Sequence, residues 1–175
     1  MRTVVCDAGP IIHLYEAHCL ALLRQTGSLY LPQRVFNEVQ ATLQMKDPWP
    51  EWLRVISLSP HEQQEAGMWK EVGDLHTGEA EAVVLARREK ADWFLTDDSA
   101  TRLFVSLLGM EVHGSLGVNL WNAAHRHLSR AETEQVLSDL EASSLWLSTR
   151  IYQEARQSLD DIYATGAHKG NQPLR

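Results

Sequence analysis

The sequence is poor in the features that identify secreted and membrane proteins. Its two cysteines, Cys6 and Cys19, do not make a disulfide framework, so we expect reduced thiols in a cytoplasmic protein. No apolar run reaches the roughly 18 residues that a membrane-spanning helix needs. Residues 1–6 are too short for the apolar core of a signal peptide, and the acidic Asp7 follows at once. Internal repeats, low-complexity stretches and glycine-rich phosphate-binding motifs are also missing.

Basic residues are in deficit as well. The 175 residues include 16 Lys and Arg against 23 Asp and Glu, a formal net charge of −7. This balance argues against a passive nucleic-acid binder, which normally presents a basic face. The length predicts one compact domain, and an apolar content of 44% excludes wholesale disorder.

Short apolar runs alternate with helical patterns along the chain, which is typical of an α/β protein with a parallel sheet and helices on its faces. The run TVVC at 3–6 is wholly apolar, as expected of a buried central strand. Further strands are predicted at 28–31, 93–96 and 111–114, with a minor edge strand at 55–58. Helices are predicted at 11–24, from 33 onward, and at 61–72, 79–89, 99–108, 116–128, 131–142 and 148–160.

The order of these elements divides the chain into three parts. Residues 1–128 are predicted to form the α/β domain, and residues 129–161 a helical extension packed on the same domain. The tail at 162–175 contains glycine and proline and has little to bury, so we expect it to be mobile or ordered by a partner.

Acidic residues end two of the predicted central strands. Asp7 follows the strand at 3–6, and the pair Asp97 and Asp98 follows the strand at 93–96. An aspartate in this position often only caps the next helix. Ligands of open parallel sheets bind outside the carboxyl ends of the strands, and two strands that end alike favour a shared site.

Two further carboxylates lie on predicted helices beside apolar positions. Glu38 borders an apolar stripe, and a solvated helix residue is an equal alternative for it. Glu79 is the first residue of a predicted helix and lies on its core-facing stripe, so its charge needs a partner. The alternative is that Glu79 only interacts favourably with the positive end of the helix dipole. Glu81 is its rival as the functional residue. With Gly78 as N-cap, Glu81 would occupy the third helical position and bond back to the cap.

Four carboxylates at one point would repel one another, so such a cluster persists when a hard divalent cation neutralises it. Mg²⁺ and Mn²⁺ prefer oxygen ligands, and Mg²⁺ keeps several waters and recruits substrate phosphates. A metal ion also lowers the pKa of a bound water, which then attacks phosphorus. The acidic residues therefore indicate metal-dependent hydrolysis of a phosphodiester, with one ion or two.

The same positions carry a family resemblance. Five segments resemble, in order and spacing, the PIN-domain nucleases and in particular their VapC-like branch of toxins. They are VVCDAGPIIHL at 4–14, LPQRVFNEV at 31–39, LHTGEAEAVVLA at 75–86, WFLTDDSATR at 93–102 and LGMEVHGSLGVNL at 108–120. Segment 131–160 is similar to the helical extension of this branch. The resemblance implies a PIN-like three-layer α/β/α sandwich with a short parallel sheet.

The resemblance also implies an Mg²⁺- or Mn²⁺-dependent ribonuclease that leaves 5′-phosphate and 3′-hydroxyl ends. Asp7, Glu38 and Glu79 match the first three acidic positions, although many relatives have Asp in place of Glu79. The fourth position falls on Asp97 or Asp98, and we prefer Asp97 because it ends the strand most directly. Thr96 and Ser99 are expected to orient a metal-bound water or a phosphate, and Arg102 is expected to contact a phosphate or to pair with an acidic neighbour.

Members of the VapC-like branch usually dimerise and are silenced by a cognate antitoxin. The resemblance therefore implies three partners: an RNA substrate, an antitoxin protein and a second copy of the chain. The alternative is a PIN-like RNA- or protein-binding module with weak catalysis. A phosphatase with Asp7 as nucleophile is a third hypothesis, but such enzymes need an aspartate two residues on, where this chain has Gly9.

A metal cluster changes the meaning of the net charge of −7. Four of the 23 acidic residues are assigned to one site, where bound ions would cancel their charge. The 16 basic residues are then available for a phosphate-binding rim, which the sequence does not locate. We therefore expect RNA binding to depend on divalent metal and to weaken as salt is added.

Overall fold

The computed structural model describes residues 1–44 and 48–167, which are built around a five-stranded sheet. The strands are β1 (Thr3–Cys6), β2 (Ser28–Pro32), β3 (Leu53–Ile56), β4 (Trp93–Leu95) and β5 (Glu111–His113). Their order in the sheet is β3-β2-β1-β4-β5, and every neighbouring pair is parallel. The predicted α/β class is confirmed, and the predicted edge strand lies at the edge but begins two residues earlier.

The central strand β1 sorts its side chains onto two apolar layers. Val4 and Cys6 face a layer formed with α1 (Ala8–Glu16), α3 (Gln33–Leu43), α7 (Ser115–Ala124) and α8 (Arg130–Ala142). Val5 faces the opposite layer, formed with α4 (Pro60–Gly73), α5 (Thr77–Glu89) and α6 (Ser99–Leu107). All three strand residues are fully buried, as expected of a parallel sheet covered on both faces. This is the predicted three-layer α/β/α sandwich.

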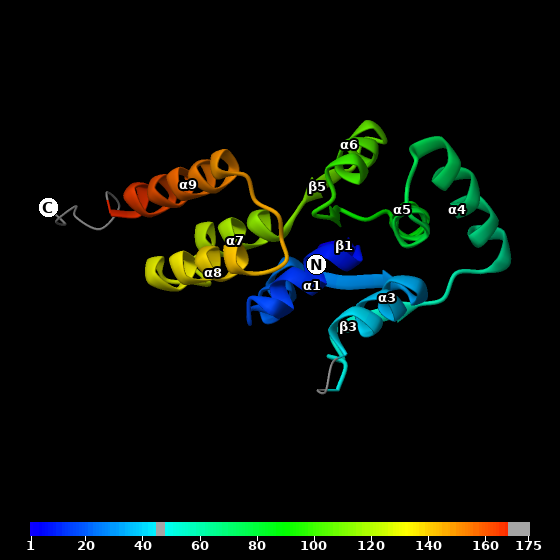
Figure 1. The fold of residues 1–175 in the computed structure, drawn as a ribbon, viewed down its shortest axis with the longest axis horizontal. Helices are drawn as coiled ribbons and strands as arrows, with labels where there is room; N and C mark the ends of the chain where they lie inside the picture. Colours follow the sequence, from blue (N-terminus) through cyan, green and yellow to red (C-terminus); the bar gives the residue numbers. More distant parts are fainter. Residues whose placement is uncertain (45–47, 168–175) are drawn as a thin grey trace, which may run out of the picture.

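The C-terminal helices pack against the domain at one end of the molecule. Helices α7, α8 and α9 (Thr149–Ala167) gather there, whereas α3, α4 and α5 lie at the other end (Figure 1). Helix α9 continues beyond its predicted end at 160, so residues 162–167 are helical and not part of a tail. Tyr163 explains this, since its hydroxyl donates to the Leu128 carbonyl at 2.8 Å and its ring lies under Arg126. Residues 168–175, the rest of the predicted tail, lie outside the described residues.

The helix predicted at 11–24 is wrong in extent. Helix α1 begins at Ala8 and ends at Glu16, and the chain then forms a 3-10 turn (Leu20–Leu22) and a short helix, α2 (Leu23–Thr26). The interruption lies at His18, which has a left-handed φ of 54°, and the following Cys19 N–H donates to the Leu14 carbonyl. In the described part of the chain, no helix has the combination of length and apolar character that crossing a membrane requires.

Gly27 allows the chain to enter β2, and it generates the first testable prediction. Its φ is +151°, and a Cβ placed there would lie 2.3 Å from the backbone oxygen of Arg2. That oxygen also accepts the Ser28 N–H at 2.8 Å, so it cannot move without loosening the start of β2. We expect Gly27→Ala to lower the free energy of unfolding by roughly 2–4 kcal/mol in urea denaturation.

Gly67→Ala is the matched control. Gly67 lies within α4, and a Cβ there would meet no atom within 4 Å. The same substitution should therefore raise the free energy of unfolding by about 0.5–1 kcal/mol through helix propensity. Equal stability of Gly27→Ala and the unmodified protein would contradict the steric argument.

Candidate active site

Asp7 lies at the point where the order of the sheet reverses. Strand β1 pairs with β2 on one side and with β4 on the other, so the connections after them leave in opposite directions. Asp7 follows β1 directly, and its N–H donates to the Leu95 carbonyl at the end of β4, at 2.9 Å. Crevices at such points, outside the carboxyl ends of the strands, are the usual binding sites of open α/β sheets. Asp7 is only 6% exposed.

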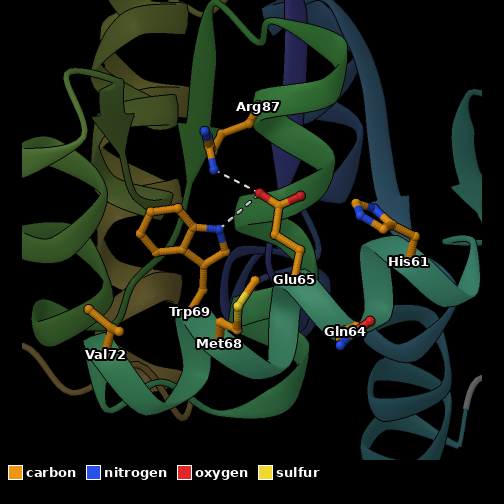
Figure 2. Close-up of a pocket in the computed structure, with 7 residues that line it drawn as sticks. All are labelled: His61, Gln64, Glu65, Met68, Trp69, Val72 and Arg87. Atoms are coloured by element: carbon orange, nitrogen blue, oxygen red, sulfur yellow. Dashed lines mark hydrogen bonds and ion pairs between the residues drawn. The ribbon is translucent and has the colours of Figure 1, made fainter.

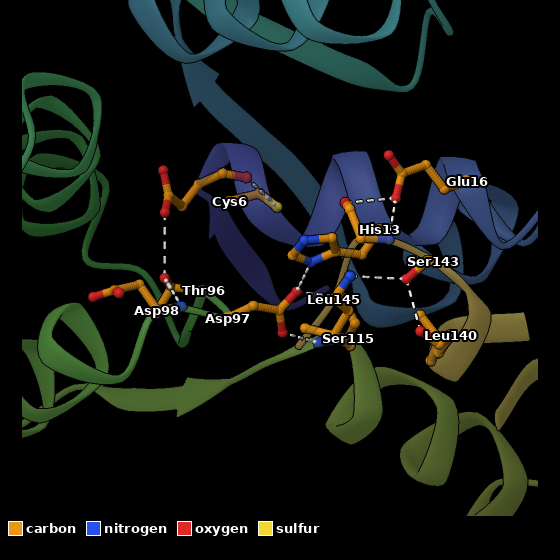
Figure 3. A network of polar contacts seen from close by, with 12 residues as sticks. Cys6, His13, Glu16, Thr96, Asp97, Asp98, Ser115, Leu140, Ser143 and Leu145 are labelled. Atoms are coloured by element: carbon orange, nitrogen blue, oxygen red, sulfur yellow. Dashed lines mark hydrogen bonds and ion pairs between the residues drawn. The ribbon is translucent and has the colours of Figure 1, made fainter. Parts of the chain in front are cut away.

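Thr96 links the ends of β1 and β4. Its hydroxyl donates to Asp7 Oδ2 at 3.2 Å and accepts the Asp98 N–H at 3.2 Å (Figure 3). The residue is fully buried, and its own N–H donates to the His113 carbonyl of β5. The predicted role of Thr96 beside the acidic residues is therefore compatible with its position, in contact with two of them.

The helices α3 and α5 bring Glu38 and Glu79 toward Asp7. Glu38 lies against the first turn of α5, where a Cβ on Gly78 would be 2.6 Å from Glu38 Oε2. Glu79 is in that first turn, and its Oε2 accepts the N–H of His76 at 2.7 Å. The negative charges of both glutamates act on Asp7. Three acidic residues that are distant in sequence thus share one electrostatic environment.

This environment disfavours the charged forms of the carboxyl groups. The pKa of Asp7 is raised from its ordinary 3.8 to about 7, mainly by burial and also by the nearby charges of Glu79 and Glu38, against hydrogen bonds that lower it. Burial also raises the pKa of Glu38, with the charges of Glu79 and Glu81 acting in the same direction. A bound cation would relieve this repulsion.

Glu79 and Glu81 exchange the capping role expected from the sequence. Helix α5 begins at Thr77 with His76 as its N-cap, so Gly78 is not the cap. Glu79 occupies the third helical position and bonds back to His76, whereas Glu81 accepts from Arg34 Nε at 3.1 Å. The prediction that Glu81 would be the capping residue is wrong, because the helix begins two residues earlier than its apolar pattern.

Asp97 and Asp98 have different surroundings. Asp97 accepts the Ser115 N–H at 2.7 Å and the Ser115 hydroxyl at 2.6 Å, and it pairs with His13 Nδ1 at 2.7 Å (Figure 3). It thereby joins the loop after β4 to α1 and to the first turn of α7. His13 and Ser115 were not predicted as parts of this network, and only the position of Ser115 at a helix start gave a signal.

Asp98 is exposed and caps α6. Its Oδ1 accepts the Thr101 N–H at 2.7 Å. Burial acts to raise the pKa of Asp98, but hydrogen bonds from Thr101 and Ala100 outweigh it and hold the pKa below its usual value. Asp98 thus stays ionised at neutral pH and is exposed at the start of α6.

The other two predicted substrate contacts, Ser99 and Arg102, differ in how they are held by the fold. Ser99 is exposed at the first position of α6. Arg102 donates to the carbonyls of Thr96 at 3.1 Å and Val112 at 3.3 Å. Its guanidinium therefore holds β4 and β5 together within the fold, and its expected contact to a substrate phosphate stays a prediction.

A hollow of about 520 Å³ between α4 and α5 lies apart from these acidic residues. Glu65 forms its polar element, accepting from Trp69 Nε1 at 3.1 Å and from Arg87 at 2.7 Å (Figure 2). Met68 and Val72 line it and are 61% and 75% exposed. Glu65 and Arg87 pair with each other, and the lining contains none of the residues of the acidic site, so this hollow is not part of it.

The donor chemistry of the acidic site fits a hard divalent cation. Its side chains offer carboxylate and hydroxyl oxygens, and the neighbouring Cys6 thiol is buried, with a pKa raised by burial and by the charges of Asp7 and Asp97. Across residues 1–44 and 48–167, no three His, Cys, Asp or Glu side chains already converge as metal ligands. The like charges would have to be drawn together by the ion itself.

A comparison with protein families shows what the chain is similar to. A family described as PIN domain matches residues 3–161, which includes the sheet, the acidic site and most of the C-terminal helical extension. No curated protein matches the chain.

The raised pKa of Asp7 leads to a prediction on stability. Asp7 has a pKa of about 7 when folded and near 3.8 when unfolded, so the folded protein binds more protons between these values. The free energy of unfolding should therefore fall as the pH rises from 4 to 7. In EDTA, we expect the unmodified protein to lose roughly 2–3 kcal/mol relative to Asp7→Asn between pH 5 and pH 8.

Urea denaturation at the two pH values measures this difference. Glu71→Gln, at an exposed position of α4, is the control and should follow the unmodified protein at both pH values. Parallel behaviour of Asp7→Asn and the unmodified protein would show that Asp7 titrates normally, in contradiction of the burial argument.

Proposed function

Because the chain belongs to the PIN-domain family, whose members are generally nucleases that use divalent metal ions, we propose that it is an Mg²⁺- or Mn²⁺-dependent endoribonuclease. The observation that carries this proposal is the Asp7 carboxyl group. It is buried at the switch point of the sheet, and its pKa is raised to about 7 by burial and by the charges of Glu79 and Glu38. A buried carboxyl group beside two other carboxylates destabilises the fold when it is charged, and it is suited to binding a cation.

The residues that would hold the metal are Asp7, Glu38, Glu79 and one of the pair after β4. When bound, the ion would lower the pKa of water and offset negative charge on the phosphate. Glu79 is preferred over Glu81 because its charge acts on Asp7, whereas Glu81 is paired with Arg34. Thr96 would orient Asp7 through its hydroxyl hydrogen bond, and Ser99 would contact the substrate from the start of α6.

For the fourth acidic ligand, the contacts favour Asp98 over Asp97. Both oxygens of Asp97 already accept hydrogen bonds from Ser115, and one of them also pairs with His13. Asp98 accepts hydrogen bonds only from the first turn of its own helix, among them the Thr101 N–H at 2.7 Å, and it is exposed. We therefore propose Asp98 as the ligand, with Asp97 as a positioning residue that keeps the loop after β4 in place.

A binding module with weak catalysis remains the second candidate function. It is favoured by one observation, that the described residues hold no preassembled group of three metal-ligating side chains. The two candidates differ in what a bound ion does. In a nuclease, loading the site with Mg²⁺ produces cleavage, whereas in a binding module it changes RNA affinity only.

The biological role that we propose is that of a toxin in a VapBC-like toxin–antitoxin pair, acting in the cytoplasm. This extends the resemblance of the sequence to the VapC-like branch to its partners, a cognate antitoxin and a second copy of the chain. Exposed apolar side chains on α4 and α6 support an interface with another protein, since Met68, Val72, Leu103 and Leu107 are each more than half exposed. Trp69 packs edge-on against Phe104, which makes these two helices neighbours.

The enzymatic proposal predicts the loss of cleavage in Asp7→Asn. With Mg²⁺ or Mn²⁺, the unmodified protein should cut single-stranded RNA, and Asp7→Asn should be slower by about 100-fold or more because one anionic ligand is lost. EDTA should abolish cleavage, and Glu71→Gln should leave it unchanged. The measurement is the rate of product formation from a labelled oligoribonucleotide on a gel. Cleavage by Asp7→Asn at the unmodified rate would overturn the mechanism.

The assignment of Asp98 predicts a contrast between two neighbouring variants. Asp98→Asn should weaken Mn²⁺ binding about tenfold in calorimetry and leave the stability nearly unchanged, because asparagine caps a helix as well as aspartate does. Asp97→Asn should retain Mn²⁺ binding more fully but lose about 2 kcal/mol, because the hydrogen bonds from Ser115 lose their charged acceptor. The reverse pattern would make Asp97 the ligand.

A further inference from the structure

A second polar hollow lies at the other end of the sheet from the acidic site. It measures about 730 Å³, and its lining includes residues at the starting ends of three strands: Arg2 before β1, Asp92 before β4 and Glu111 in β5. Asp7 and the pair Asp97 and Asp98, by contrast, follow the carboxyl ends of β1 and β4. Because all the strands are parallel, the two sites lie at opposite ends of the strands.

Flat cationic and aromatic groups make up much of this hollow. The Arg2 guanidinium lies 3.8 Å from the ring centre of Trp93, whose ring is 4.0 Å from that of His113. The Trp121 ring packs edge-on against Trp93 at 5.6 Å and stacks on His125 at 4.0 Å, with 28° between their planes. All five residues line the hollow. Trp93 is only 4% exposed, so the planar groups that can stack on a ligand are those of Arg2, Trp121 and His125.

The charges of the hollow favour a ligand that donates hydrogen bonds. Two carboxylates, Asp92 and Glu111, face one guanidinium, so a phosphate is not the preferred occupant. One oxygen of Asp92 accepts the Thr3 N–H at 2.7 Å, and one oxygen of Glu111 contacts His113 Nε2 at 2.8 Å. The second oxygen of each carboxylate is left to accept from a ligand.

We propose that this hollow binds an unpaired guanine base of RNA. Guanine combines a large stacking face with adjacent N1–H and N2–H donors that match one carboxylate. Adenine and cytosine offer an amino group beside an acceptor, and uracil a single N–H between two acceptors. Unpaired bases are recognised in this way, by stacking on aromatic rings or arginine planes and by hydrogen bonds to their edges. The choice of RNA as the ligand rests on the proposed function.

The tryptophan indole N–H signals in a ¹H–¹⁵N spectrum provide a local test. In EDTA, where metal does not bridge a phosphate to the acidic site, GMP should shift the Trp121 signal in a saturable way. IMP lacks the 2-amino group and should bind about tenfold more weakly. AMP, CMP and UMP should also be weaker than GMP. The comparison of GMP with IMP needs no protein variant, so it does not depend on the folding of a mutant.

Variants of the protein test the two elements of the site. Glu111→Gln should weaken GMP binding about tenfold, and Arg2→Ala should weaken it to a similar extent. Arg54→Ala is the matched control, because Arg54 also lies over an aromatic ring, 5.7 Å from Tyr30, but does not line the hollow. It should bind GMP as the unmodified protein does.

Three results would overturn the inference: no saturable shift with GMP, equal binding of GMP and IMP, or binding unaffected by Glu111→Gln. Preferential binding of N-acetyl-arginine amide would instead identify a pocket for a cationic protein side chain and also overturn it. RNA cleavage without GMP binding would leave the proposed nuclease function intact. GMP binding without any cleavage would remove that function and retain the guanine site.

Discussion

The burial of β1 is the constraint on which the rest of the structure depends. Its residues are covered on both faces and hydrogen-bonded to parallel strands on both edges, so the strand has no freedom to shift its register. The next residue, Asp7, is consequently held at the point where the sheet reverses its order. A carboxyl group placed there loses most of its hydration, and its pKa rises to about 7. The chemistry of the site therefore follows from the packing of a four-residue strand, because that packing sets how strongly burial destabilises the ionised form of Asp7.

The loop after β4 is held by polar contacts that link both helical layers. Asp97 accepts from Ser115 at the start of α7 and pairs with His13 of α1, while Arg102 on α6 reaches back to two strand-end carbonyls. These interactions leave Asp98 as the more accessible carboxylate of the pair. Two adjacent aspartates thus have different surroundings, because successive residues at the end of a strand point in different directions.

The sequence predicts the strands and most helices well where one physical signal dominates. Short apolar runs identify β1 and β4, and the PIN-domain resemblance and the family match agree on the fold. Helix ends are predicted less well. The interruption at His18 depends on a left-handed residue that no glycine or proline announces, and the extension of α9 depends on Tyr163 bonding to Leu128, 35 residues away. The predicted start of α5 is two residues too late, because the first turn, from Thr77, precedes the apolar pattern. The same error makes Glu81 the expected capping residue in place of Glu79.

The fold class and the candidate acidic residues follow from the amino-acid sequence alone, since strand periodicity and the order of the motifs are local properties of the chain. How those residues differ depends on the tertiary structure. It brought Glu38 and Glu79 into the electrostatic environment of Asp7, paired Glu81 with Arg34, and engaged Asp97 with Ser115 and His13. It also brings residues from separate strands and a helix together in the aromatic hollow at the other end of the strands. Burial and hydrogen-bond partners depend on residues distant in sequence, and they determine which carboxylates keep an open coordination site.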